Sequence, residues 1–93
     1  MHALVTRVTI HNADHTREML TNQVVPRVSG APGFQTGYWT WSGGGGLNGL
    51  AMMIFDSEEN ARAAGERLRA VAAEGADDVT LDSVEVREVV ASA

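Results

Sequence analysis

The first residues of the chain alternate between two faces in a way that predicts a β-strand. Between residues 3 and 10, Leu4 and Val8 fall on one side of an extended chain, whereas Arg7 falls on the other. Many residues in this stretch are β-branched, which favours extended backbone. We therefore expect residues 3–10 to form the first strand, with Leu4 and Val8 facing the same layer.

The spacing of apolar residues then changes to one of three or four, which is typical of a helix. Asn12 or Asp14 offers an N-cap, and the apolar positions as far as Val28 predict a helix of about 14 residues. Pro26 lies in its last turns and is expected to kink the helix or end it early. The stretch SGAPGF, residues 29–34, is typical of a loop.

Two further strands flank a run of four glycines. Residues 34–42 are rich in aromatic side chains and predict the second strand, and LNGLAMMIF, residues 47–55, predicts the third. A phosphate-binding loop needs a helix start after its glycines and usually a lysine, and neither is present. Gly43–Gly46 are therefore interpreted as the turn of a β-hairpin, with a mobile flap as a further possibility.

The stretch that follows Asp56 predicts the second helix. Asp56 or Ser57 provides its N-cap, and Gly75 ends it. Its apolar stripe consists of Ala61, Ala64, Leu68, Val71 and Ala72. The small size of these side chains favours close packing of this helix on its neighbours.

The last strand spans about residues 79–90, and its apolar positions change phase. Val79 and Leu81 occupy odd positions, whereas Val84 and Val86 occupy even ones. A bulge near residues 82–83 would bring all four side chains to one face.

The resulting order, strand-helix-strand-strand-helix-strand, predicts a ferredoxin-like βαββαβ fold of the α+β class. In this fold a four-stranded antiparallel sheet carries both helices on one face. The 93 residues are enough for a single domain, 1–93. The third strand is apolar on both sides, since Leu50 and Met52 alternate with Ala51 and Met53. We expect a second copy of the chain to cover the free face, so that the two sheets form a homodimeric α+β barrel.

Charge and composition exclude several classes of function. The chain carries seven arginines, no lysine and twelve acidic residues, for a net charge of −5, and its basic residues are scattered, which argues against nucleic-acid binding. It has no cysteine, so disulfides and thiolate metal sites are excluded. The N-terminus lacks the pattern of a signal peptide and no apolar run is long enough to cross a membrane, so a cytoplasmic location is expected.

Three stretches of the sequence resemble a known family. They are VVPRVSGAPGF leading into the second strand, MMIFDSEENARAAGERL from strand into helix, and VTLDSVEVREVV near the end. Over nearly the whole chain the sequence is similar to the dimeric α+β barrel proteins related to antibiotic biosynthesis monooxygenases, especially their small actinobacterial-type members. These stretches are specific for the fold and weak for the chemistry.

The resemblance implies a function in the binding or oxidation of small molecules. Monooxygenases of this group need no cofactor and oxidise flat aromatic compounds held by polar and tryptophan side chains inside the barrel. Candidates for such ligand-binding positions are Arg7, Tyr38, Trp39 and Trp41. The haem-degrading relatives carry an axial histidine on a helix, but the predicted second helix has none, so no cofactor is expected. No catalytic residue is assigned.

Each candidate residue also has a purely structural interpretation. Trp39 and Trp41 share one side of their strand, and packing in the core or the dimer interface explains them as well as ligand stacking does. Arg7 pairs with Glu85 or Glu88 of a neighbouring strand, or it awaits an anionic ligand. The histidines near the N-terminus do not share one helix face, and we expect no metal site.

Three classes of function stay open. The first is a barrel that binds or oxygenates a small apolar or aromatic molecule, with Arg7 and at least one tryptophan at the cavity wall. The second is a non-catalytic structural or regulatory dimer whose barrel interior is filled by side chains. The third is an isomerase or decarboxylase, which would need a histidine or carboxylate facing inward.

Overall fold

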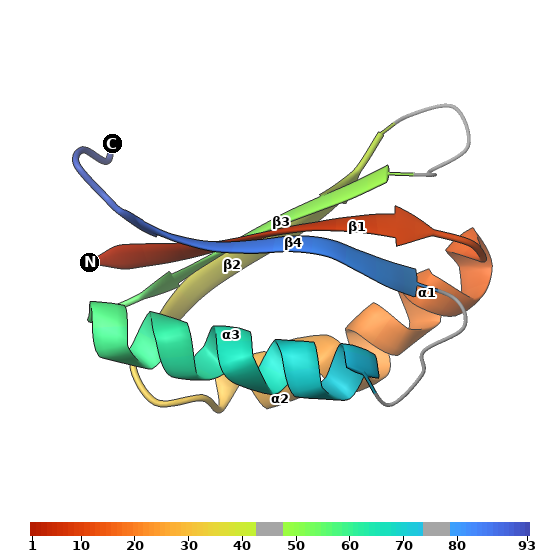
Figure 1. Ribbon diagram of the computed structural model, residues 1–93, viewed down its shortest axis with the longest axis horizontal. Helices are drawn as coiled ribbons and strands as arrows, with labels where there is room; N and C mark the ends of the chain where they lie inside the picture. The colour runs from red at the N-terminus through yellow and green to blue at the C-terminus, as the bar shows by residue number, and fades with distance from the viewer. Residues whose placement is uncertain (43–47, 74–78) are drawn as a thin grey trace.

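The computed structural model describes residues 1–42, 48–73 and 79–93. Its strands form one antiparallel sheet in the order β2-β3-β1-β4. Their bounds are His2–Ile10 for β1, Phe34–Trp41 for β2, Asn48–Phe55 for β3 and Val79–Glu88 for β4. The helical elements are α1 (Ala13–Met19), η1 (Leu20–Val24), α2 (Val25–Ser29) and α3 (Glu58–Ala73). All of them lie on one face of the sheet (Figure 1), which confirms the predicted ferredoxin-like α+β fold.

The elements α1, η1 and α2 are continuous, and we call them together the first helical segment. This segment stays helical through Pro26, which was expected to kink the helix or end it early. Asn12 caps its start, because its side-chain oxygen accepts a hydrogen bond from the His15 backbone N–H. Just before Pro26 the segment widens into a π turn, in which the Val25 N–H donates to the carbonyl of Leu20, five residues earlier. Proline has no N–H and its ring crowds the carbonyl four residues before it. The wide turn relieves this conflict without ending the segment.

The predicted bulge in the last strand is confirmed. Arg7 lies opposite Ser83 and Val8 lies opposite Leu81, so Asp82 has no partner in the ladder. The Asp82 carboxylate instead accepts a hydrogen bond from the Thr9 hydroxyl at 2.7 Å. Leu81 and Val84 therefore both face the helices, one on each side of the bulge.

The start of α3 is tied to the chain that enters β2. Ser57 caps α3, since its hydroxyl accepts a hydrogen bond from the Asn60 N–H at 3.2 Å. The Asp56 N–H donates to the carbonyl of Gly33 at 2.9 Å. Gly33 has a φ of 76°, and a side chain there would overlap the Asp56 carboxylate and the Asn60 amide. The predicted end of the helix at Gly75 lies outside the described residues.

The strands on either side of the glycine run pair as predicted. β2 and β3 form an antiparallel ladder, and the Ser42 N–H extends it with a hydrogen bond to the Asn48 carbonyl at 2.8 Å. The expected turn or flap at Gly43–Gly46 lies outside the described residues. The β2–β3 ladder thus confirms the two strands of the predicted hairpin.

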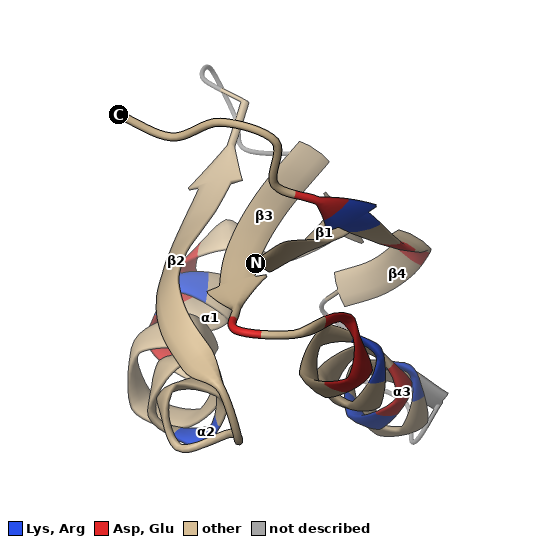
Figure 2. Cartoon of the chain, turned by 90° about the vertical axis from the view of Figure 1, so that its left-hand side faces the viewer, with Lys and Arg blue, Asp and Glu red and all other residues tan. Residues whose placement is uncertain are grey.

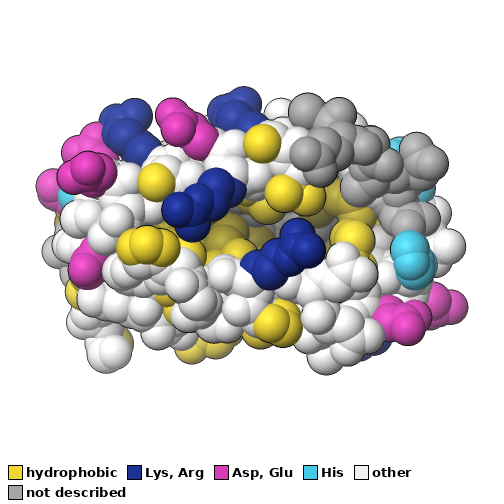
Figure 3. Space-filling model, turned by 90° about the horizontal axis from the view of Figure 1, so that it is seen from below, with side chains coloured by type: hydrophobic (Ala, Val, Ile, Leu, Met, Phe, Trp, Pro, Cys, Tyr) yellow, Lys and Arg dark blue, Asp and Glu magenta, His cyan; other side chains and the backbone are white. Residues whose placement is uncertain are grey.

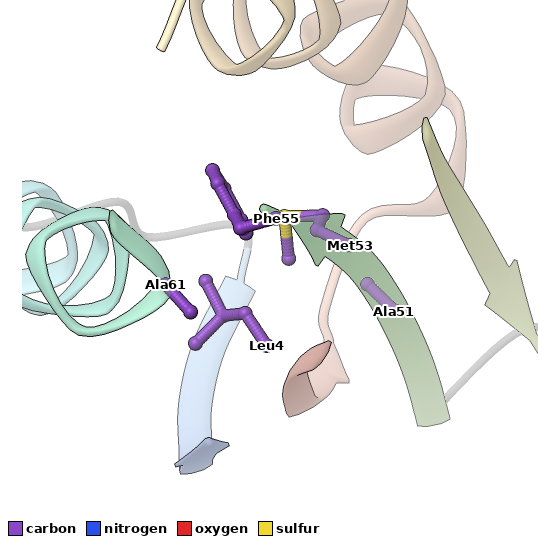
Figure 4. Packing of buried hydrophobic residues seen from close by; sticks show 5 residues of the cluster. All are labelled: Leu4, Ala51, Met53, Phe55 and Ala61. Carbon is purple, nitrogen blue, oxygen red and sulfur yellow. The ribbon is translucent and has the colours of Figure 1, made fainter. Parts of the chain in front are cut away.

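One end of the helix-covered face is tightly packed. Figure 4 shows Ala61 of α3 lying toward Leu4 of β1 and Phe55 of β3. Phe55 and Ala61 are fully buried, and the Phe34 ring meets the Phe55 ring edge-on with centroids 5.8 Å apart. We call the region formed by Phe34, Phe55 and Ala61 the packed end. Burial of these apolar side chains is the main source of its stability.

The other face of the sheet has no helix over it, and we call it the open face. Strand alternation and pairing place Arg7, Tyr38, Leu50 and Met52 together on it. Tyr38 is 68 % exposed, Met52 45 % and Leu50 40 %. β3 supplies the exposed apolar side chains Leu50 and Met52 at the centre of this face, whereas Ala3 and Val5 of β1 are buried. β2 and β3 carry no charged residue (Figure 2). A single copy of the chain therefore leaves apolar side chains in contact with water on this face.

Candidate functional site

A cavity of about 850 Å³ lies between the sheet and the helical segments. Its floor includes Trp39, Ala51 and Met53 from β2 and β3, and its walls include Leu20 of η1 and Leu68 of α3. Seen from the helix side, the molecule is hollowed between the two helical segments, and the hollow has an apolar floor (Figure 3). The lining is mostly apolar, as is usual in sites for small molecules.

Both tryptophans of the chain lie in this cavity. On β2 they face the helices, and their neighbours on β3 are small, since Trp39 lies opposite Ala51 and Trp41 lies opposite Gly49. Gly37 also leaves room, because a Cβ there would lie 3.0 Å from the Trp39 ring. Large rings beside small residues thus form an aromatic wall next to open space.

One helical wall of the cavity contains the π turn. Leu20, Gln23 and Val24, all in η1, line the cavity. Turns of this kind are rare and occur frequently at functional sites. The irregular part of the helix therefore coincides with the wall of the cavity.

A buried hydroxyl group also belongs to the cavity. Thr16 of α1 is only 3 % exposed, and it lines the cavity. Its Oγ1 has no hydrogen-bond partner among the described residues. Leaving a buried hydroxyl unpaired costs about 1–3 kcal/mol, so a polar group of a ligand would relieve a real penalty here.

Three arginines contribute the only charged side chains among the described lining residues. Arg17 comes from α1, Arg27 from α2 and Arg67 from α3. The Arg17 guanidinium lies over the Trp41 ring, 4.8 Å from its centroid, in a cation–π contact. No aspartate, glutamate or histidine is among the residues that line the cavity in the described part of the chain. The electrostatic character of the site is therefore positive.

The structure separates the four residues that the sequence singled out. Trp39 and Trp41 line the cavity on the helix side, whereas Tyr38 and Arg7 lie on the open face. The cavity thus has tryptophans at its wall but not Arg7, and it lies beneath the helices rather than against the open face. Neighbouring residues of one strand point in opposite directions, so Tyr38 and Trp39 cannot share a site on one side of the sheet.

The expected pairing of Arg7 with Glu85 or Glu88 is wrong. The bulged register places Ser83 opposite Arg7, and Glu85 accepts a hydrogen bond from Arg87 at 2.8 Å. Arg7 forms no ion pair with any residue in the described ranges. Its guanidinium is exposed on the open face.

The histidines near the N-terminus have structural partners. His11 Nε2 lies 2.8 Å from the Thr80 hydroxyl, which links the end of β1 to β4. The backbone N–H of His15 donates to the cap residue Asn12. Within the described ranges, no three histidine, cysteine, aspartate or glutamate side chains form a group that could hold a metal ion.

Sequence reasoning missed the unpaired Thr16 hydroxyl and the three arginines of the cavity. For two of them the sequence holds a weak signal. Neither Arg27 nor Arg67 has a carboxylate three or four residues away, whereas Arg62 has Glu58 at that spacing. An arginine without such a neighbour on its helix is free to serve another partner.

Comparisons with known proteins support the fold alone. No protein-family model matches the chain, and no curated protein matches it in sequence. Among solved structures, the crystal structure of HapK from Hahella chejuensis is similar, with a TM-score of 0.73 and 8 % sequence identity. The alignment covers 100 % of this chain and 96 % of HapK. None of the helices in the described ranges is long and apolar enough to span a membrane.

Proposed function

We propose that this protein binds a small apolar or aromatic molecule in the cavity between its sheet and its helical segments. The observation that carries the proposal is that both tryptophans of the chain line an apolar hollow that its own side chains leave unfilled. A volume of about 850 Å³ lies within the range of natural ligand pockets. Trp39 and Trp41 supply flat faces for stacking.

We further propose that the protein acts as a homodimer joined through its open face. Large apolar patches on a free sheet face mark interaction surfaces, and Met52 and Leu50 lie at the centre of this one. Tyr38 and Arg7 then belong to the interface between the sheets. A second copy would bury these side chains at the same positions in both subunits, as two-fold symmetry requires.

Two of the three interpretations left open by the sequence, the ligand-binding protein and the structural dimer, are compatible in this arrangement. Side chains of the open face would fill the space between the two sheets, as in a structural dimer. The ligand would bind elsewhere, beneath the helices of each subunit. Dimerisation and ligand binding therefore use opposite faces of one sheet, and of the four residues named on the open face only Leu50 also lines the cavity.

Binding is better supported than catalysis. The resemblance to antibiotic biosynthesis monooxygenases implies cofactor-free oxidation of aromatic compounds, whereas isomerisation or decarboxylation needs an inward histidine or carboxylate. The described lining residues include neither type of side chain. A monooxygenase-like reaction is thus a secondary proposal, tested by oxygen uptake with any ligand that binds. The cytoplasmic location expected from the sequence stays a prediction.

Tryptophan fluorescence tests the binding proposal directly, because Trp39 and Trp41 are the only tryptophans and both line the cavity. A panel of flat aromatic molecules is titrated into the wild type and into Trp39→Phe and Trp41→Phe. We expect saturable changes in emission, and weaker binding measured by calorimetry in the variants. Tyr38→Phe, on the same strand but the opposite face, is the matched control and should bind normally. The absence of saturation with every compound, together with no adduct in native mass spectrometry, would refute the proposal.

Sedimentation velocity at micromolar concentration tests the dimer. The wild type should sediment as a dimer, and Met52→Glu should sediment as a folded monomer, because a buried unpaired charge is costly. Ala63→Glu, at an exposed position of α3, is the control and should remain dimeric. A well-folded wild-type monomer would refute the dimer without affecting the proposed cavity.

A further inference from the structure

We propose that the ligand of this cavity is an amphipathic anion, whose apolar body stacks on the tryptophans and whose acidic group is held by Arg27 and Arg67, one on each helical wall. This inference rests on the proposed binding function and specifies the chemical class of the ligand. The class is a small aromatic or aliphatic acid that carries a carboxylate or a group of similar charge and geometry.

The first step concerns the partners of the arginines. Of the seven arginines, Arg62 donates to Glu58 at 2.6 and 2.9 Å, Arg87 donates to Glu85, and Arg69 donates to the Val84 carbonyl. The other four have no hydrogen-bonded acceptor in the described ranges. Three of these four line the cavity. In a chain with twelve acidic residues, the arginines that lack an acceptor are concentrated at one site.

The second step concerns their arrangement. Arg17 and Arg27 belong to the first helical segment and Arg67 belongs to α3, so the positive charges approach the cavity from both of its helical walls. Figure 3 shows basic side chains on both sides of the apolar hollow. Arginine binds carboxylates through parallel N–H donors, and its charge does not depend on pH in the physiological range. The mouth of the cavity therefore favours an anion over a cation or a neutral group.

The third step concerns the interior. The floor formed by Trp39, Met53 and their neighbours offers little to a second charged group, because burial of an unpaired charge is costly. The unpaired Thr16 hydroxyl provides one polar contact along the wall. A ligand that fits both parts has one acidic end near the arginines and an apolar body with at most a few neutral polar atoms.

Isothermal titration calorimetry with two matched pairs of ligands tests this inference. The pairs are 2-naphthoate with 2-naphthamide, and decanoate with decanamide, each titrated into the full-length wild type near neutral pH. Within a pair the apolar body is the same and only the charge differs. We expect at least one acid to bind about tenfold more tightly than its amide, since hydrogen bonds to charged groups are stronger than neutral ones.

Variants identify the responsible residues. In the double variant Arg27→Gln/Arg67→Gln, the preference for the acid should be lost, while the affinity for the amide changes by less than about twofold. Arg62→Gln, on the same helix as Arg67 but paired with Glu58, is the matched control and should keep the preference. Added salt should weaken binding of the acid in the wild type and leave binding of the amide nearly unchanged.

The possible outcomes separate the two proposals. Equal binding of acid and amide by the wild type, or an unchanged preference in the double variant, would overturn the anion inference and leave the binding function in place. Failure of all four compounds to bind would overturn the binding function together with the anion inference. The supporting result is that Arg27→Gln/Arg67→Gln loses the preference for the acid, whereas Arg62→Gln keeps it. The circular dichroism spectra of both variants should match that of the wild type.

Discussion

The two ends of the helix-covered face are built from the same elements but packed in opposite ways. At the packed end, Phe55 and Ala61 are fully buried and the Phe34 ring completes the contact between β2 and β3. Toward the other end, Trp41 lies opposite Gly49 and beneath the Arg17 guanidinium of α1, and the cavity opens there. The cavity does not extend to Phe34, Phe55 or Ala61.

This difference separates stability from binding within one layer. Close-packed side chains contribute most to the free energy of folding, because every removed methylene leaves a void. Residues around an existing hollow contribute less, since part of their surface already lacks neighbours. The chain therefore tolerates an unfilled region at one end because the other end is tightly packed.

The largest expected effect comes from removing a large side chain at each end. Phe55→Ala should lower the free energy of unfolding by about 3–5 kcal/mol, because it leaves a cavity in the packed end. Leu68→Ala, at the cavity wall, should cost only about 1 kcal/mol, because this side chain is already partly exposed. Urea denaturation at one fixed protein concentration measures both values. Equal losses would show that the two ends do not differ in packing.

A smaller effect is expected from adding volume at two alanines of α3. Ala61→Leu should destabilise the protein by about 1–3 kcal/mol, because Ala61 has no free space around it. Ala72→Leu places the same group at the cavity and should change stability by less than about 0.5 kcal/mol. The two variants differ only in position along one helix, so each is the control for the other. Thermal melting of both provides the measurement, and a stronger effect at Ala72 would contradict the proposed hollow.

The smallest effect concerns the surface at the start of α3. A hydrogen bond from Arg62, together with its charge, lowers the pKa of Glu58 below its ordinary value of 4.5. A carboxylate with a depressed pKa contributes stability that is fully present above its unfolded pKa and is lost as the pH falls through its folded pKa. The melting temperature of the wild type should therefore decline more steeply below pH 4.5 than that of Arg62→Gln. In the Arg62→Gln background, the further substitution Glu58→Gln removes the titrating carboxyl group. It should not change further how steeply the melting temperature declines below pH 4.5.

Much of the fold follows from the sequence because periodicity is a local signal. Alternation identified each strand, and the change of phase between Leu81 and Val84 located the bulge. The expectation that Pro26 ends the helix early is wrong, and the π turn that accommodates the proline could not be predicted, because such a turn has no distinctive residue pattern. Local rules therefore predicted the elements better than the details within them.

The site was harder to predict because it depends on register and on contacts between distant segments. Alternation shows that Trp39 and Trp41 share a face, but both faces of β2 carry aromatic side chains, so hydrophobicity does not reveal which one the helices cover. The pairing of Trp39 with Ala51 and of Trp41 with Gly49 places both rings on the same side of the sheet as Leu4 and Met53, and this pairing is a contact between strands. The convergence of arginines from α1, α2 and α3 is likewise visible only in three dimensions.

The π turn fixes the rotational phase of everything that follows it in the first helical segment. In a regular α-helix each residue advances by about 100° around the axis, and a π turn absorbs roughly one such step. If residues 13–29 were wound without it, Val28 would turn away from the core and Arg27 would turn away from the cavity. The direction in which the Arg27 side chain points therefore depends on the one extra residue of the π turn that precedes Pro26.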